Sequence, residues 1–172
     1  MDRKIEKYKV PAIVLGMSVN GLGVVRSLGK EGVKAFALDS EASKPYMHTR
    51  YATPLICPDA QKEPERLKVF LLDLARKNGG TAVVFPTSDI FNAFVHRYRD
   101  ELIPELLFSI PLTTLMNKLL DKKGQYDLAR KFDVPTPMTF LPTKITEIDD
   151  IAKQLSYPVI IKGLNTVTWR AK

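Results

Sequence analysis

The 172-residue sequence contains a single cysteine, Cys57, so it can form no internal disulfide. This is typical of a protein from a reducing cytoplasm. No uninterrupted apolar run approaches the roughly 20 residues that a membrane-spanning helix needs. Residues 1–7 are charged and lack the apolar centre of a signal peptide. We therefore predict a cytoplasmic protein with no membrane partner.

The sequence also lacks the charge pattern of a nucleic-acid-binding protein. Its 26 Lys and Arg against 19 Asp and Glu give a net charge of +7, which favours anionic partners. The basic residues are scattered, however, with the densest run at 118–123, and no basic stripe alternates with aromatic residues. We therefore expect small phosphates or carboxylates as partners, and no nucleic acid.

Short apolar runs alternate with helical patterns over residues 1–111. Strands are expected at 10–16, 33–38, 52–56, 82–85 and 106–109. Helices are expected at 20–31, at 64–77, and where the apolar face of a third runs from Phe91 to Leu102. This alternation predicts an α/β domain with an open, doubly wound parallel sheet of Rossmann-like type.

Residues 112–172 form a second region with a different pattern. Helices are expected at 112–120, at 121–132 and from Thr146, and strands at 138–141 and 159–162. A helix–strand–helix–strand segment of this length cannot close a hydrophobic core. We therefore predict a linker helix followed by an incomplete α+β lobe.

The turn after the first expected strand carries the first candidate site, and we assign substrate binding to Gly16, Ser18, Asn20 and Gly21. Glycines at a strand-to-helix turn let a ligand approach the backbone, and the helix N-terminus offers free N–H groups to anions. The same glycines could instead serve only helix–strand packing. The glycine spacing does not match the Gly-x-Gly-x-x-Gly fingerprint of dinucleotide sites, although Asp39 ends the second strand as in those folds.

A second candidate site follows the strand at 82–85. Thr87, Ser88 and Asp89 lie where parallel strands end, and ligands bind at that edge of such sheets. We assign these three residues to substrate binding. Helix capping by Ser88 or Asp89 is the structural alternative.

Two lysines form the third candidate. Lys122 opens a helix, and Lys162 ends the apolar run at 158–161, so we expect it to leave a buried strand. A lysine is rarely placed there without a partner. Ammonium groups of this kind suit nucleotide phosphates.

Together these motifs resemble the N-terminal half of an ATP-grasp ligase, close to the carboxylate–amine ligases and carbamoyl-phosphate synthase-like proteins. The resemblance covers nearly the whole chain. It rests on the glycine turn at 16–23, on 49–51, on 86–89, and on Asp121 and Lys122 followed by 132–137, where Asp133 replaces the usual glycine. The run at 157–162 resembles the family's Tyr-Pro strand that ends in lysine.

The resemblance implies that ATP phosphorylates a carboxylate and that an amine attacks the resulting acyl phosphate. Lys122 and Lys162 match the lysines that hold the ATP phosphates, and Mg²⁺ would bridge those phosphates. The acidic metal ligands of the family lie later in its sequence, so we assign no metal ligand and no catalytic residue to this chain. We expect the 172 residues alone to bind ATP weakly or not at all and to be inactive.

Two other functions remain open at this point. One is an NAD(P)-binding Rossmann domain of an oxidoreductase, and the other is a non-catalytic subunit of a split synthetase. A half-finished lobe would expose apolar surface and favour association, either as a homodimer or with a missing C-terminal half.

Overall fold

The protein was analysed as a computed structural model, which describes residues 9–109 and 113–163. The chain divides into two compact units, Met1–Ile110 and Pro111–Lys172, which are described separately below. No helix among the described residues is long and apolar enough to cross a membrane.

A five-stranded parallel sheet forms the centre of the first unit, with the strand order β3-β2-β1-β4-β5. In chain order the strands are β1 (Ala12–Leu15), β2 (Ala35–Asp39), β3 (Thr53–Ile56), β4 (Ala82–Pro86) and β5 (Leu106–Leu107). The central position of β1 explains its sequence, because all four of its residues are buried and a parallel strand covered on both faces must be apolar throughout. The α/β fold predicted from the sequence is confirmed.

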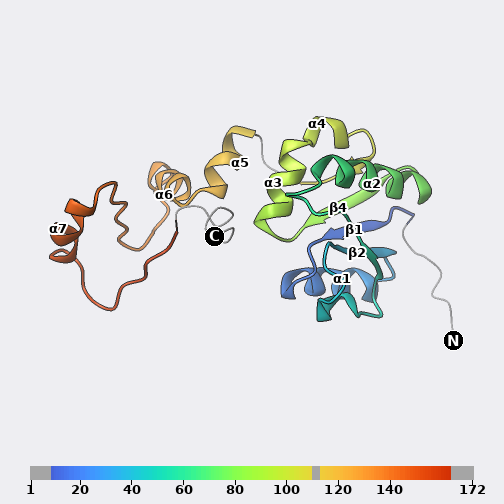
Figure 1. Cartoon of the computed structure of the whole chain (residues 1–172), viewed down its shortest axis with the longest axis horizontal. Helices are drawn as coiled ribbons and strands as arrows, with labels where there is room; N and C mark the ends of the chain where they lie inside the picture. Colours follow the sequence, from blue (N-terminus) through green and yellow to red (C-terminus); the bar gives the residue numbers. More distant parts are fainter. Residues whose placement is uncertain (1–8, 110–112, 164–172) are drawn as a thin grey trace. The chain divides into compact units, whose positions relative to one another are not determined.

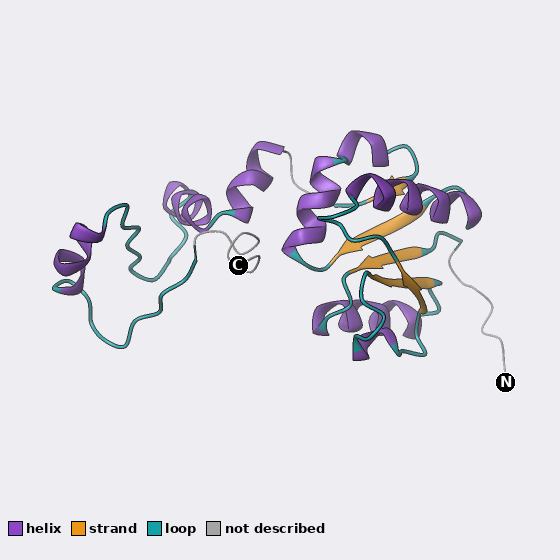
Figure 2. Ribbon diagram, viewed as in Figure 1, coloured by secondary structure: helices purple, strands orange, loops and turns teal. Residues whose placement is uncertain are grey.

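Helices cover both faces of this sheet (Figures 1 and 2). The helices of the first unit are α1 (Val19–Lys30), the 3₁₀ helix η1 (Pro45–Met47), α2 (Pro64–Lys77), α3 (Asp89–Arg97) and α4 (Arg99–Leu102). Figure 1 shows α1 on one face and α2 with α3 on the other. The chain moves from β1 outward in one direction and from β4 outward in the other, so right-handed crossovers place the helices on opposite faces.

Two packed helices begin the second unit, α5 (Thr113–Leu120) and α6 (Lys122–Lys131). Asp121 caps α6, because its carboxylate accepts the backbone N–H of Gly124 at 3.0 Å. At the other end Asp133 is left-handed, with φ of +52°, and the N–H of Val134 donates to the carbonyl of Ala129 at 2.8 Å. A left-handed residue at the end of a helix is most often glycine, and here Asp133 takes that conformation.

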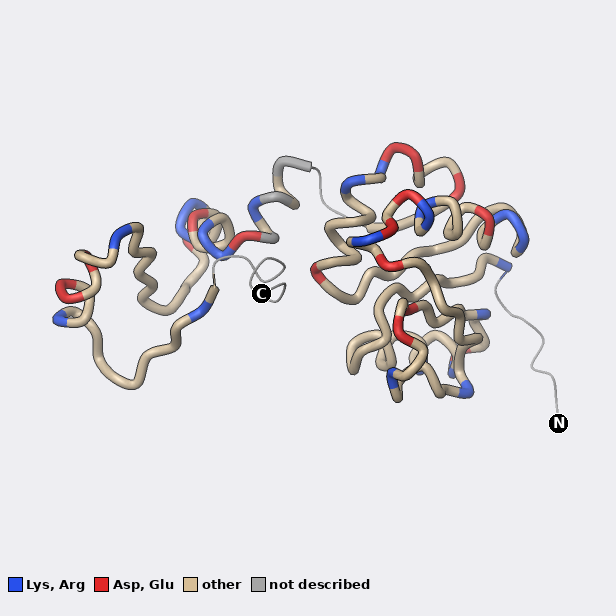
Figure 3. The backbone as a smooth tube through the Cα atoms, viewed as in Figure 1, with Lys and Arg blue, Asp and Glu red and all other residues tan. Residues whose placement is uncertain are grey.

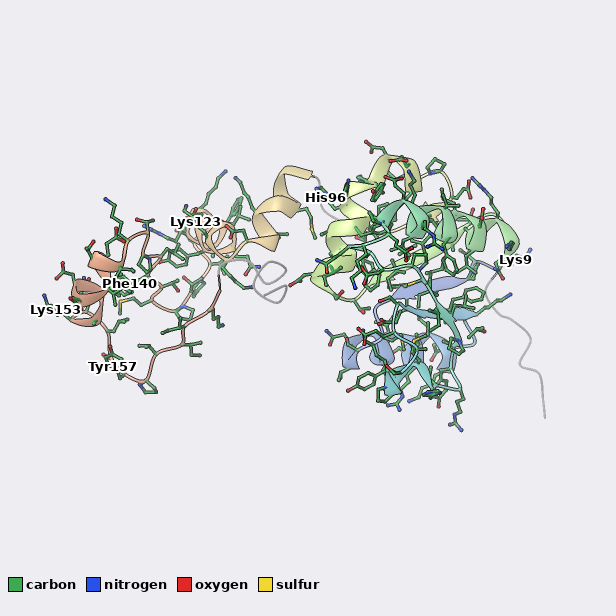
Figure 4. The ribbon with its side chains drawn as sticks, in the orientation of Figure 1. Lys9, His96, Lys123, Phe140, Lys153 and Tyr157 are labelled. Atoms are coloured by element: carbon green, nitrogen blue, oxygen red, sulfur yellow. The ribbon has the colours of Figure 1, made fainter. Side chains whose placement is uncertain are left out.

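The strands predicted at 138–141 and 159–162 are wrong, because both segments are extended coil in the structure. A strand needs a neighbour for its backbone hydrogen bonds, and no strand forms among residues 113–163. Ile160 and Ile161 are 82% and 93% exposed, so the expected burial of this run is wrong as well. Figure 4 shows Tyr157 on the open loop that follows α7 (Ile148–Ala152).

The helix expected from Thr146 starts one residue earlier, as the 3₁₀ helix η2 (Ile145–Glu147), which runs into α7. At its start, the backbone N–H and the hydroxyl of Thr143 donate to the carboxylate of Glu147 at 3.0 and 3.1 Å. Met116 is the only buried residue among those of this unit whose burial the structure describes, so the described part forms no hydrophobic core of its own.

Candidate functional site

The ends of β1 and β4 lie side by side, and the chain leaves them in opposite directions. This is the switch point of an open α/β sheet, where such folds bind ligands. The Thr87 side chain ties the two ends together, because its hydroxyl lies 3.0 Å from the carbonyl oxygen of Leu15 and 2.5 Å from that of Gly16. The two candidate segments that the sequence placed seventy residues apart therefore form one site.

Glycine is required twice in the first of these segments. Gly16 has φ of +94°, and a Cβ atom there would lie 3.0 Å from the Phe91 ring and 3.1 Å from the Thr87 hydroxyl. A Cβ on Gly21 would collide with the carbonyl oxygen of Gly16. Packing alone thus accounts for Gly21, while the bare backbone of Gly16 faces the second segment.

Ser18 and Ser88 are the N-cap residues of α1 and α3, respectively, and neither side chain makes a capping hydrogen bond. Their hydroxyls and the unpaired N–H groups of two first turns are therefore available to an anion at this edge. Asn20 and Asp89 lie exposed in the same first turns. The arrangement offers hydroxyl and N–H donors to a carboxylate, and one acidic side chain to an ammonium group.

Asp39, at the end of β2, is buried, with 2% of its surface exposed. Its carboxylate accepts the N–H of Met17 at 2.8 Å, the N–H of Glu41 at 3.2 Å and the Lys44 ammonium at 2.9 Å. Lys44 was not singled out in the sequence. Because both oxygens already have protein donors, Asp39 is not free to bind a ribose, and this argues against the NAD(P) alternative.

The two candidate lysines differ in their surroundings. Lys122 is half-buried at the start of α6, and its ammonium donates to the side-chain oxygen of Gln125 at 3.3 Å. Lys162 is exposed on extended coil. The assignment of both lysines to ATP therefore remains a prediction that rests on the resemblance.

No metal centre is built into the described part of the chain. No group of three or more His, Cys, Asp or Glu residues there is arranged to hold an ion. Figure 3 shows the basic residues distributed over both units rather than gathered into one stripe, in keeping with the scattered charge of the sequence.

Comparison with known proteins gives one significant curated relative, while no family model matches the chain. The relative is the D-aspartate ligase of Enterococcus faecium, which is 21% identical over an alignment covering 98% of this chain. That alignment covers 42% of the relative, so the chain spans about two fifths of its length.

Several solved structures share the fold. The L-amino acid ligase of Bacillus licheniformis has a TM-score of 0.58 at 14% identity, covering 91% of this chain and 36% of the ligase. The N5-carboxyaminoimidazole ribonucleotide synthetase of Thermotoga maritima has a TM-score of 0.55 at 14% identity, covering 87% of this chain and 37% of the synthetase. A third similar structure is the biotin carboxylase domain of a Hydrogenobacter thermophilus 2-oxoglutarate carboxylase, solved with MgADP and bicarbonate. It has a TM-score of 0.55 at 17% identity, covering 86% of this chain and 33% of the carboxylase domain.

The four proteins are named as ligases, a synthetase and a carboxylase domain, and this chain covers between 33% and 42% of each. The sequence relative and the shared fold together point to the ATP-grasp ligase superfamily, and they confirm the resemblance predicted from the sequence motifs.

Proposed function

We propose that this chain is the N-terminal part of an ATP-dependent ligase that activates a carboxylate as an acyl phosphate for attack by an amine. The observation that carries the proposal is the switch-point site, where Thr87 joins the ends of β1 and β4 beneath two helix N-termini. Two of the relatives are named as amino acid ligases and a third is solved with bicarbonate, and donors of this kind suit a carboxylate.

In this proposal Gly16, Ser18 and the segment from Thr87 to Asp89 bind the carboxylate substrate. The exposed Asp89 carboxylate would favour a substrate that also carries an ammonium group, such as an amino acid. Lys122 and Lys162 would neutralise the ATP phosphates, because fixed cations stabilise the charge on a transferring phosphoryl group. Mg²⁺ would bridge the same phosphates, with ligands from residues outside this chain.

ATP binding is tested by calorimetric titration of the chain with MgATP, beside Lys122→Gln and Lys162→Gln. A matched control is Lys153→Gln, which removes the same charge from an exposed ion pair on α7. We expect weak binding that either lysine variant lowers at least threefold and the control leaves unchanged. Equal binding by all four proteins would contradict the role of both lysines.

The chain alone is expected to show no ATP-dependent amide formation, because it spans only about two fifths of its relative. The check is an assay of ADP release with each amino acid as carboxylate and ammonia or an amine as acceptor. Turnover by the 172-residue chain would overturn this part of the proposal.

The second unit favours one further candidate, a subunit that associates with another chain. Its apolar side chains are exposed where a folded lobe would cover them, among them Ile145 at 87% and Ile161 at 93%. Exposed apolar surface of this kind marks interaction sites. We expect concentration-dependent self-association through this surface in sedimentation velocity, and a monomer at every concentration would contradict the homodimer form of this candidate.

A further inference from the structure

A second concave site lies on the first unit, away from the switch point. It is a cavity of about 480 Å³ between α1 and the segment that leads into β3. Small-molecule sites usually occupy about 300–1,000 Å³. The lining residues are Arg26, Lys30, His48, Thr49, Arg50 and Tyr51.

The topology places this cavity at the opposite edge of the sheet from the candidate ligase site. Helix α1 begins beside the end of β1 and runs back across the sheet, so Arg26 and Lys30 lie in its second half. Tyr51 precedes the first residue of β3, where the parallel strands begin. At 1.5 Å per residue, the 12 residues of α1 run about 18 Å along the helix axis from the switch-point edge toward this one.

Close packing holds the floor of the cavity in place. A Cβ atom on Gly29 would lie 2.5 Å from the carbonyl oxygen of Tyr51 and 2.7 Å from its Cβ, so α1 approaches this segment only because residue 29 is glycine. The N–H of Tyr51 also donates to the Thr49 hydroxyl at 3.3 Å. The fold therefore fixes the backbone of α1 against Tyr51, while the charged side chains that line the cavity are exposed.

The charge in the cavity is of one sign. Three of its lining residues are Lys or Arg, and none is acidic. The Arg50 guanidinium donates to the Tyr51 hydroxyl at 3.0 Å and lies 5.0 Å from the centre of its ring. That hydrogen bond, together with the charges of Arg50, Lys30 and Arg26, lowers the pKa of the Tyr51 phenol below its ordinary value of 10.0. The side of the cavity that carries Tyr51 is therefore lined by positive charge.

The nearby end of α1 does not cancel this potential. Carbonyls in its last turn accept N–H groups from the residues that follow, Glu31 and Val33 donating to Leu28 and Gly32 to Gly29. These carbonyls are therefore already paired with N–H donors. The three cations remain the dominant charges at the cavity.

We propose that this cavity binds a small phosphorylated molecule, with the phosphate held by Arg26, Lys30 and Arg50. A phosphate group carries more than one charge at neutral pH and presents several acceptor oxygens, so it suits a cavity lined by three cations better than a single carboxylate does. The volume leaves room for the rest of a metabolite beside the Tyr51 ring. The site is independent of the proposed ligase chemistry.

The test is calorimetric titration of the full chain with inorganic pyrophosphate, with citrate as a polycarboxylate of comparable charge. We expect one saturable site per chain that Arg26→Gln and Arg50→Gln each weaken at least tenfold. Lys77→Gln removes one exposed positive charge from α2 on the other face of the sheet and should have no effect. The double variant Lys122→Gln with Lys162→Gln should also bind normally, which separates this site from the proposed ATP site.

A second readout locates the ligand without relying on affinity. Bound pyrophosphate neutralises the local cations, so the pKa of Tyr51, followed by NMR, should rise toward its ordinary value. Absence of saturable binding, citrate binding as tight as pyrophosphate, an unchanged Tyr51 titration, or equal weakening by Lys77→Gln would each overturn the proposal. Circular dichroism of every variant confirms that the fold is retained.

Discussion

The Thr87 hydroxyl lies 3.0 Å from the carbonyl oxygen of Leu15, to which the Thr87 backbone N–H also donates at 2.9 Å. One residue after β4 is thereby fastened to the last residue of β1 by both its main chain and its side chain. This double attachment fixes the two turns of the switch point relative to each other.

Thr87→Val removes the hydroxyl while keeping the shape of the side chain. We expect a loss of about 1 kcal/mol in the free energy of unfolding, because the Leu15 carbonyl keeps its backbone donor. Thr87→Ser retains the hydroxyl and should stay close to wild type. Urea unfolding measures both, and equal stability of the valine variant and wild type would show that the side-chain bond contributes nothing.

Gly21 and Gly23 lie in the same helix and provide a matched pair. A Cβ on Gly21 would collide with the Gly16 carbonyl, whereas a Cβ on Gly23 meets no atom within 4 Å. Gly21→Ala should cost about 2 kcal/mol through overpacking. Gly23→Ala should stabilise by about 0.5–1 kcal/mol, because alanine is the better helix former. Similar changes at the two positions, measured by thermal unfolding, would contradict the packing role of Gly21.

Lys44 supplies the only side-chain cation on the buried Asp39 among the described residues, at 2.9 Å. Lys44→Met leaves that carboxylate with backbone donors alone, and we expect destabilisation of about 1–2 kcal/mol, reduced because Lys44 itself is 34% exposed. Lys153→Met breaks a fully exposed ion pair and should change stability by less than about 0.5 kcal/mol. Chemical denaturation measures the free energy of unfolding of both variants. Equal losses would contradict a stabilising role of Lys44 beside Asp39.

Burial raises the pKa of the Cys57 thiol from 9.0 to about 12, and the nearby Asp39 charge adds to the shift. The native thiol should therefore resist alkylation and thiol–disulfide reagents at pH 8, while the urea-unfolded chain reacts readily. Because the unfolded thiol ionises first, its contribution to stability is complete below pH 9 and falls as pH rises through 9 toward 12. If Cys57 were labelled at the same rate in the native and the urea-unfolded chain, its thiol could not be buried in the native state.

Local pattern explains which elements the sequence predicted well. Helix α2 has the predicted bounds, since its buried Leu67, Leu71 and Ala75 repeat at helical spacing. The strands of the first unit form close to where short apolar runs predict them, because a strand covered on both faces must be apolar along its length.

Non-local pairing explains the failures. The run ending at Lys162 has the composition of a strand, yet a strand exists only beside another, and the described residues of the second unit provide none. The Asp39–Lys44 pair and the cavity beside Tyr51 were missed for a related reason. Each depends on a turn or a helix approach that no local spacing encodes.

The sequence by itself determined the class of fold, the alternation of its elements and the resemblance to ATP-grasp ligases, because periodicity and motif order are properties of the chain alone. Only the tertiary structure decided that Thr87 reaches Leu15, that the buried Asp39 accepts the N–H of Met17, and that Arg26 and Lys30 line one cavity with Tyr51. Those residues are distant in sequence, and they meet only when the sheet has set its strand order.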